Sequence, residues 1–142
     1  MLLIDTNIFL EIILEQKQAD ECQAVLDKIF TQHLPALITH YSIHSIAAIL
    51  SHKKKEHAFA DFIESLERMP SVHVYATTPQ EEKLIAKKCR ELKLDFDDAL
   101  QYWAAQTGGC ESILSLDSDF DQTDLPRMTP TQFNKTFLEK QK

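Results

Sequence analysis

Glycine is almost absent from this chain, whose 142 residues contain only two glycines, adjacent at Gly108 and Gly109. The glycine-rich phosphate loops of the GxGxxG and GxxxxGK types need several glycines at fixed spacings. The sequence therefore excludes both loops and argues against nucleotide-cofactor chemistry of those kinds.

Cysteine is also scarce, and no long apolar run is present. The three cysteines, at positions 22, 89 and 110, form no CxxC pair and leave an odd count. This usage predicts free thiols in a reducing cytosol, and hence a cytoplasmic protein. No apolar run approaches the roughly 20 residues of a membrane span, and no basic segment precedes Asp5 as a signal peptide would require. We therefore expect neither membrane insertion nor secretion.

An excess of basic residues is missing as well, because the formal net charge is -7. This balance argues against a broadly basic nucleic-acid-binding surface. It leaves room for a nuclease, since a metal site needs carboxylates and a local basic strip can contact phosphate. One such strip is Lys53, Lys54 and Lys55, for which a solvated helix junction is the simpler interpretation. The length predicts a single domain over residues 1–142.

Short apolar segments alternate with helical patterns along the chain. We expect strands at 1–4, 35–39, 72–75, 112–116 and 126–129, and helices in the intervening segments and after the last strand. Thr6 is the expected N-cap of the first helix. Strands separated by helices pair in parallel through right-handed crossovers. The pattern predicts an α/β fold with a parallel sheet of four or five strands and helices on both faces.

Aspartates stand where two of these strands end and where one helix begins. Asp5 follows the first strand, Asp117 follows the fourth, and Asp98 opens the sixth helix. Because the carboxyl ends of parallel strands face one crevice, these side chains are expected to meet there. Oxygen ligands without His or Cys suit Mg²⁺ or Mn²⁺, which can activate water against a phosphodiester. Asn7 and Ser115 are expected to orient the acids or bound waters.

Each aspartate also has a structural interpretation. Asp5 could cap the first helix, and Asp97 and Asp98 favour the positive end of the sixth helix. Asp117, Asp119 and Asp121 suit turns. Capping alone does not readily explain two strands that both end on Asp, which favours a shared metal site.

Four segments together resemble the PIN-domain family, to which the single-domain ribonuclease toxins of VapC-type toxin–antitoxin pairs belong. They are DTN at 5–7, DDALQYWAA at 97–105, ILSLDSDF at 113–120 and TPTQF at 129–133. The resemblance implies a three-layer α/β/α sandwich and a ribonuclease site that uses Mg²⁺ or Mn²⁺ as cofactor. Asp5 matches the first acid of the family, Asp98 the third and Asp117 the fourth, and Ser115 matches the hydroxyl residue two positions before the fourth.

One position departs from the family pattern. The second acid is usually a Glu about six residues beyond a Ser or Thr such as Thr39, and here that position is Ser45. Asp95, Asp97 or Asp121 could compensate for the missing acid. Two hypotheses follow. The first is an endoribonuclease acting on single-stranded RNA as the toxin of a toxin–antitoxin pair, and the second is a PIN-like module that binds nucleic acid or protein with weakened or lost turnover.

The resemblance also implies partners. In the toxins, the helices after the first strand commonly receive a segment of a small antitoxin protein, and homodimers are common. An antitoxin at the first two helices would account for the surplus apolar surface of residues 8–14, IFLEIIL.

Overall fold

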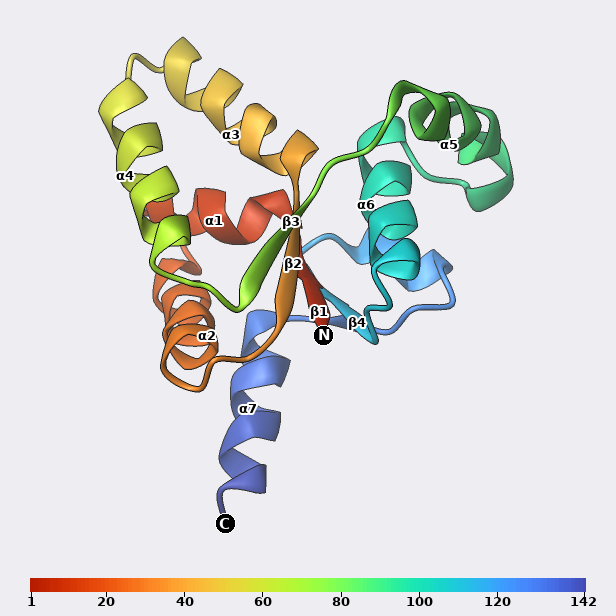
Figure 1. The fold of residues 1–142 in the computed structure, drawn as a ribbon. Coiled ribbons are helices and arrows are strands. Elements are labelled where there is room, and N and C mark those ends of the chain that lie inside the picture. Colours follow the sequence, from red (N-terminus) through yellow and green to blue (C-terminus); the bar gives the residue numbers. More distant parts are fainter.

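A computed structural model describes all residues, 1–142. Its centre is a sheet of five parallel strands in the order β3-β2-β1-β4-β5 (Figure 1). The strands are β1 (Leu2–Ile4), β2 (Ala36–Thr39), β3 (Val72–Tyr75), β4 (Ser112–Leu114) and β5 (Arg127–Met128). The expected parallel sheet is confirmed. Its fourth strand ends two residues earlier than predicted, at Leu114 rather than Leu116.

Helices occupy the segments between the strands and follow the last one. They are α1 (Thr6–Ile13), α2 (Ala19–Thr31), α3 (His40–His52), α4 (Glu56–Glu67), α5 (Pro79–Leu92), α6 (Phe96–Thr107) and α7 (Pro130–Lys140), and a 3₁₀ turn, η1 (Ser118–Gln122), follows β4. None of these helices combines the length and the apolar character that crossing a bilayer requires.

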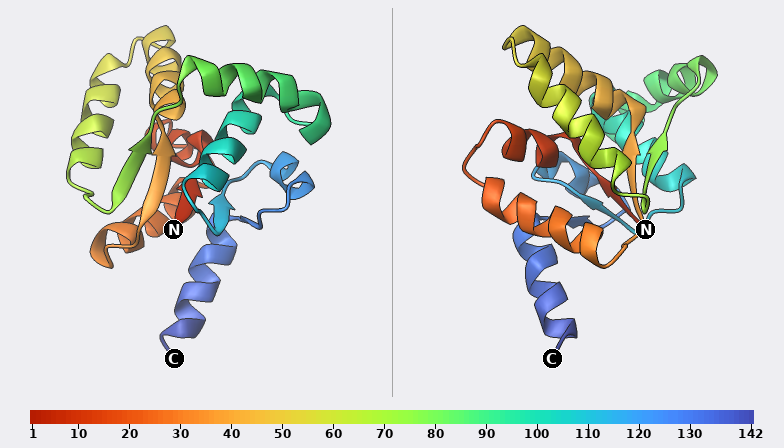
Figure 2. Two further views of the ribbon diagram at one scale, coloured as in Figure 1. Left: turned by 45° about the vertical axis from the view of Figure 1, so that its right-hand side comes forward. Right: turned by 60° about the vertical axis from the view of Figure 1, so that its left-hand side comes forward.

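Alternating residues of the strands send their side chains to opposite faces of the sheet, as the period of two requires. One face packs against α1 to α4 and α7, and the other against α5, α6 and η1. Figure 2 shows α4 and α6 on opposite sides of the sheet. The strand residues pointing to the first face include Ile4, Ile38 and Leu114, and those pointing to the second are Leu3, Leu37 and Ile113. This arrangement is the expected three-layer α/β/α sandwich.

Local chemistry fixes where several helices begin and end. Thr78 and Thr129 form capping boxes with Glu81 and Gln132, each followed by a proline at the first helical position. The expected cap at Thr6 was wrong by one residue, because the Asp5 side chain accepts the hydrogen bond that caps α1. Gly108 ends α6 against β2, where a Cβ would lie 2.7 Å from Leu37 Cδ2.

The strand order places the site. From β1 the chain crosses to β2 and β3 on one side, whereas β4 and β5 pair on the other side of β1. The carboxyl ends of β1 and β4 therefore flank the point where the direction of winding reverses. Open α/β sheets bind ligands in the crevice at such a point.

Candidate functional site

A pocket of about 320 Å³ opens at the carboxyl ends of β1 and β4. It is called the acidic pocket below, because four of its eleven lining residues are aspartates and none is Lys, Arg or His. It is lined by Asp5, Thr6, Asn7, Leu10, Tyr41, Ser45, Ile49, Asp97, Asp98, Gln101 and Asp117. Residues that are distant in sequence thus line one pocket at the carboxyl ends of these two strands.

Asp5 is buried at the end of β1, with only 6% of its surface exposed. Its Oδ1 accepts a hydrogen bond from the Thr6 backbone N–H at 2.7 Å, and its Oδ2 accepts one from Ser115 Oγ at 2.6 Å. Burial raises the pKa of Asp5 to about 6, although these two donors favour the ionised form and oppose the rise. Asp5 therefore caps α1 and lines the pocket at the same time.

Asp98 lies in the first turn of α6 and is 8% exposed. Burial is the main reason that the pKa of Asp98 is raised to about 7, and the charges of Asp97, Asp117, Asp5 and Asp119 raise it further. At neutral pH this carboxyl carries its charge only at a cost. A cation in the pocket would lower that cost, since it neutralises the repulsion among the carboxylates.

Two groups of aspartates bring their carboxylate oxygens within 4.8 Å of one another. One group is Asp98, Asp117 and Asp119, and the other is Asp95, Asp97 and Asp98. Asp98 belongs to both groups, and the first joins α6 to the segment after β4. Several carboxylate oxygens without imidazole or thiolate are the donor set that Mg²⁺ and Mn²⁺ prefer. The residues present therefore fit a hard divalent cation.

Hydrogen bonds hold the segment after β4 in place. Ser115 Oγ, which donates to Asp5, accepts a hydrogen bond from the Asp117 N–H at 2.9 Å. Asp117 Oδ1 in turn accepts the Asp119 N–H at 2.9 Å and caps η1. Asn7 Oδ1 accepts the Leu116 N–H at 3.4 Å. Ser115 thus bonds Asp5 and the backbone of Asp117, and Asn7 bonds the backbone one residue before Asp117.

Polar side chains form a buried network beneath the carboxylates. Gln101 Nε2 donates to Thr6 Oγ1 at 3.2 Å, to Ser42 Oγ, and to Asp5 Oδ1 at 3.4 Å. Ser42 Oγ also accepts from Thr39 Oγ1 at 3.0 Å. The buried Gln101 Oε1 has no hydrogen-bond partner. An unsatisfied buried acceptor is costly, so the network is incomplete at this atom.

The predicted site residues divide into two sets. Asp5, Asp98, Asp117, Asp97 and Asn7 line the one pocket. Asp95, at the exposed start of α6, does not line it but brings a carboxylate oxygen close to those of Asp97 and Asp98.

The other predicted residues do not line the pocket. Asp121 is engaged by Arg127, whose Nε and Nη2 donate to its two carboxylate oxygens at 2.9 and 3.1 Å. That pairing lowers the pKa of Asp121, whose charge is balanced by Arg127 outside the pocket lining. Lys53, Lys54 and Lys55 form the exposed junction between α3 and α4, at the top of Figure 1 and away from the pocket lining.

Sequence reasoning missed three contributors: Asp119 as a member of the cluster, and Gln101 and Ser42 in the supporting network. Two of these had a usable signal. Gln101 lies three residues after Asp98 on one helix, so both share a face, and Ser42 lies three residues after the α3 cap Thr39.

Ser45 lies in the wall of the acidic pocket. The family pattern expects a carboxylate at this place, and α3 contributes none to the pocket. The departure seen in the sequence is therefore a departure at the site itself.

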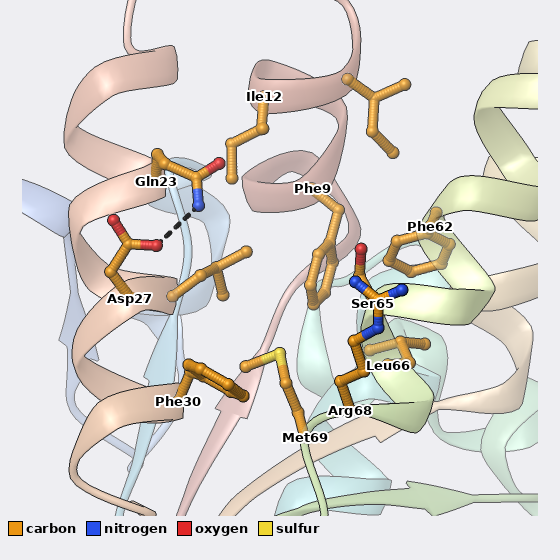
Figure 3. A pocket seen from close by; sticks show the side chains of 12 residues that line it. Phe9, Ile12, Gln23, Asp27, Phe30, Phe62, Ser65, Leu66, Arg68 and Met69 are labelled. Carbon is orange, nitrogen blue, oxygen red and sulfur yellow. Dashed lines mark hydrogen bonds between the residues drawn. The ribbon is translucent and has the colours of Figure 1, made fainter.

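A second cavity, of about 250 Å³, lies between α1, α2 and α4 and is called the apolar groove (Figure 3). Phe9, Phe62 and Met69 form its buried part, whereas Phe30 is 47% exposed. Eight of its twelve lining residues are hydrophobic. Of residues 8–14, where surplus apolar surface was expected, Phe9, Ile12 and Ile13 line this groove, whereas Ile8 is fully buried in the core.

The protein is a parallel α/β/α sandwich with a group of aspartates at the point where the direction of winding reverses. A sequence model of the PIN domain matches residues 2–125, and the chain belongs to the PIN domain family. No curated protein sequence gives a significant match.

Solved structures share this fold at low sequence identity. The VapC20 toxin of Mycobacterium tuberculosis, described as cleaving the sarcin–ricin loop, is 13% identical with a TM-score of 0.70, over 88% of this chain and 96% of that one. A toxin–antitoxin complex from Klebsiella pneumoniae is 16% identical with a TM-score of 0.62, and the match covers 92% of this chain and 98% of that one. PAE2754 from Pyrobaculum aerophilum is 16% identical with a TM-score of 0.66, and the match covers 97% of this chain and 89% of that one.

Proposed function

We propose that this chain is a metal-dependent endoribonuclease that cleaves single-stranded RNA, and that it is the toxin of a toxin–antitoxin pair. The observation that carries the proposal is the meeting of Asp5, Asp98 and Asp117 in one pocket. Membership of the PIN domain family and the likeness to VapC20 support a nuclease. A cytoplasmic location fits this proposal, since that is where the RNA would be met.

Asp98, Asp117 and Asp119, with Asp5 beside them, are the residues that would hold Mg²⁺ or Mn²⁺. When bound, such an ion lowers the pKa of water and offsets the charge of a phosphodiester. The other residues of the site position the carboxylates. Ser115 and the Thr6 N–H fix both oxygens of Asp5, and the low exposure of Asp5 and Asp98 limits access of bulk water.

Cleavage assays with substituted aspartates test this proposal. In Mg²⁺ or Mn²⁺, we expect Asp98→Asn and Asp117→Asn each to reduce cleavage of a single-stranded RNA by at least about 100-fold, since even residues behind the metal ligands cost 10- to 100-fold. Chelation by EDTA should abolish the wild-type activity. Equal cleavage by the wild type and both variants would remove these residues from the mechanism.

Ser45 supports a second candidate, a PIN-like module that binds nucleic acid or protein without efficient turnover. The pocket lacks the carboxylate expected from α3, which would lower its affinity for the ion. Ser45→Glu decides between the candidates. A gain of cleavage from an inactive wild type would show that the missing acid had silenced the site, whereas an active wild type rejects the second candidate.

The apolar groove is the proposed seat of an antitoxin segment. Its floor of Phe9, Phe62 and Met69 suits the apolar face of an amphipathic helix, a common way of recognising peptides. Arg68 and Asp27 line the groove as well and offer charges of both signs at its edge. The Klebsiella neighbour is itself a toxin–antitoxin complex. A homodimer remains a further prediction of the family resemblance.

Binding to a candidate antitoxin tests this part. The product of a small reading frame adjoining the gene should bind the chain, and Phe30→Ala should weaken binding without changing RNA cleavage, because Phe30 lies in the groove and outside the acidic pocket. Unchanged binding by Phe30→Ala and by Ile13→Ala would place the partner elsewhere.

A further inference from the structure

Two aromatic rings from different helices meet beside the acidic pocket. Tyr41, the second residue of α3, lines the pocket and is 37% exposed. Phe96, the first residue of α6, lies edge-to-face with it, with ring centroids 6.2 Å apart and ring planes at 72°. Such a pair is a favourable geometry for two rings, and it holds the Tyr41 ring while leaving part of it open to solvent.

The chain anchors this pair to the acids. Phe96 is partly buried against the core on the α6 face of the sheet, and Asp97 and Asp98 follow it directly. Tyr41 and Ser45 are four residues apart on α3 and line the same pocket. A ligand that reaches the carboxylates of the pocket would therefore pass beside the Tyr41 ring.

Charge restricts what can hold a polyanion at this place. The pocket lining contains no Lys, Arg or His, and the formal net charge of the chain is -7. Contacts to phosphate from cationic side chains are therefore missing from the pocket. Stacking of bases on aromatic rings does not depend on charge or base identity, and it is the other general source of affinity for single strands.

Two further rings lie on the same helix. His40 and His44, both exposed, lie on α3 next to Tyr41 in the helix, and their ring centroids are 4.2 Å apart. Three aromatic side chains thus lie on the first half of α3, whereas the other large exposed hydrophobic residues, Phe30, Val74, Leu84 and Leu138, lie on α2, β3, α5 and α7.

We propose that Tyr41, supported by Phe96, is a stacking platform for one nucleobase of a single-stranded RNA whose phosphate enters the acidic pocket. This inference rests on the proposed function and adds a substrate-binding residue to it. RNA is favoured over a second copy of the chain because the ring lines a pocket with Asn7, Ser45 and Asp97, whereas the centre of a protein interface is depleted of charge.

The test uses the full chain and a short single-stranded RNA that carries 2-aminopurine, whose fluorescence falls when it stacks. Stopped-flow mixing in Mn²⁺ reads binding before turnover, and steady-state assays of the same RNA give KM and kcat. The variants are Tyr41→Leu, Tyr41→Phe and Phe96→Leu, with Leu138→Ala on α7 as the control. Thermal melting verifies that each variant is folded.

We expect Tyr41→Leu to weaken RNA binding at least about fivefold and to lose the fluorescence quench, with the loss appearing in KM rather than kcat. Tyr41→Phe keeps the ring and should behave as the wild type, as should Leu138→Ala. Phe96→Leu should give an intermediate loss.

Equal binding and equal quench in the wild type and Tyr41→Leu overturn the platform, whether or not the chain cleaves. RNA cleavage by the wild type in the same assay leaves the proposed function standing in that case. A wild type that neither binds nor cleaves the RNA overturns both. Sedimentation of the wild type and of Tyr41→Leu tests whether a second copy of the chain covers Tyr41 instead of RNA. A change of oligomeric state in Tyr41→Leu with unchanged RNA affinity assigns Tyr41 to a contact between copies and overturns the platform.

Discussion

The acidic pocket and the apolar groove share one short helix and differ in almost everything else. Thr6, Asn7 and Leu10 of α1 line the acidic pocket, whereas Phe9, Ile12 and Ile13 of the same helix line the apolar groove. The groove is built from side chains that pack into the core of its face of the sheet. The pocket is built from carboxylates that burial and mutual repulsion destabilise in their charged form.

Burial of side chains has opposite effects on the free energy of folding in the two regions. Apolar burial at the groove stabilises the fold by roughly 1.5–3 kcal/mol for each large side chain. Burial of Asp5 and Asp98 works against folding at neutral pH, because each must lose its charge or keep it in a poor environment. Departures from the stable arrangement are expected at functional sites, which is where the acidic pocket belongs in this account.

The largest expected effect on stability is at the floor of the groove. Phe9 is 3% exposed and packs edge-to-face on Phe62, with ring centroids 5.1 Å apart. Phe9→Ala should lower the free energy of unfolding by about 3–5 kcal/mol, because it removes a ring from a filled core. Denaturant titration measures this loss.

Phe30→Ala is the matched control for Phe9→Ala, since it removes the same atoms from the exposed part of the same groove. Its cost should be much smaller, within about 1 kcal/mol. Similar losses for the two variants would mean that the groove is not open in the free protein.

At the pocket, stability should depend on pH in the opposite sense to ordinary acid denaturation. The folded pKa of Asp98, about 7, lies above the 3.8 of an unperturbed aspartate, so the folded protein binds the proton more tightly than the unfolded chain. The stability that this protonation contributes is present below pH 4 and is lost as the pH rises towards 7. Without divalent metal, Asp98→Asn should therefore be more stable than the wild type at pH 8 by a few kcal/mol.

Thermal melting in EDTA at pH 5 and pH 8 checks this prediction. The difference in Tm between Asp98→Asn and the wild type should shrink at pH 5, where the wild-type carboxyl is protonated. A difference that does not change with pH would contradict the account of Asp98. The comparison with Asn cancels the titration of the six histidines, which both proteins share.

A carboxylate added at Ser45 should sharpen the contrast between the two regions. Ser45→Glu places a fifth acid in the pocket lining and should raise the affinity for Mn²⁺ about tenfold. Ser45→Gln, of nearly the same shape, should not. Isothermal calorimetry compares the two, and equal affinities would show that position 45 does not reach the ion.

The smallest expected effect is at Asp121. Because Arg127 already holds both of its carboxylate oxygens outside the pocket, Asp121→Asn should leave RNA cleavage unchanged. The assay used for Asp98→Asn measures it. A loss comparable to that of Asp98→Asn would require a role for Asp121 that its pairing does not provide.

Much of the fold could be predicted from local patterns. The apolar spacing of each helix and the short apolar runs of the strands gave the α/β alternation, and parallel pairing followed from it. Strand and helix ends shifted by a residue or two, because side-chain caps decide them: Asp5 took the cap position expected at Thr6.

Residues of the site could be predicted where they lie at the end of a strand or in the first turn of a helix. Asp5, Asp98 and Asp117 met that condition, and they share one pocket. The roles of Asp119 and Asp121 depend on the turn of η1 and on Arg127 of β5, which the sequence pattern does not specify. The apolar groove could not be located from α1 alone, because α2 and α4 form its other walls.

Titration of the metal-free protein with Mn²⁺, followed by calorimetry, shows whether the three aspartates act as ligands of one ion. We expect saturable binding by the wild type and by Asp121→Asn, and loss of that binding in Asp98→Asn and Asp117→Asn. No binding by the wild type, or the same binding in all four proteins, would contradict the claim that these distant aspartates hold one divalent ion.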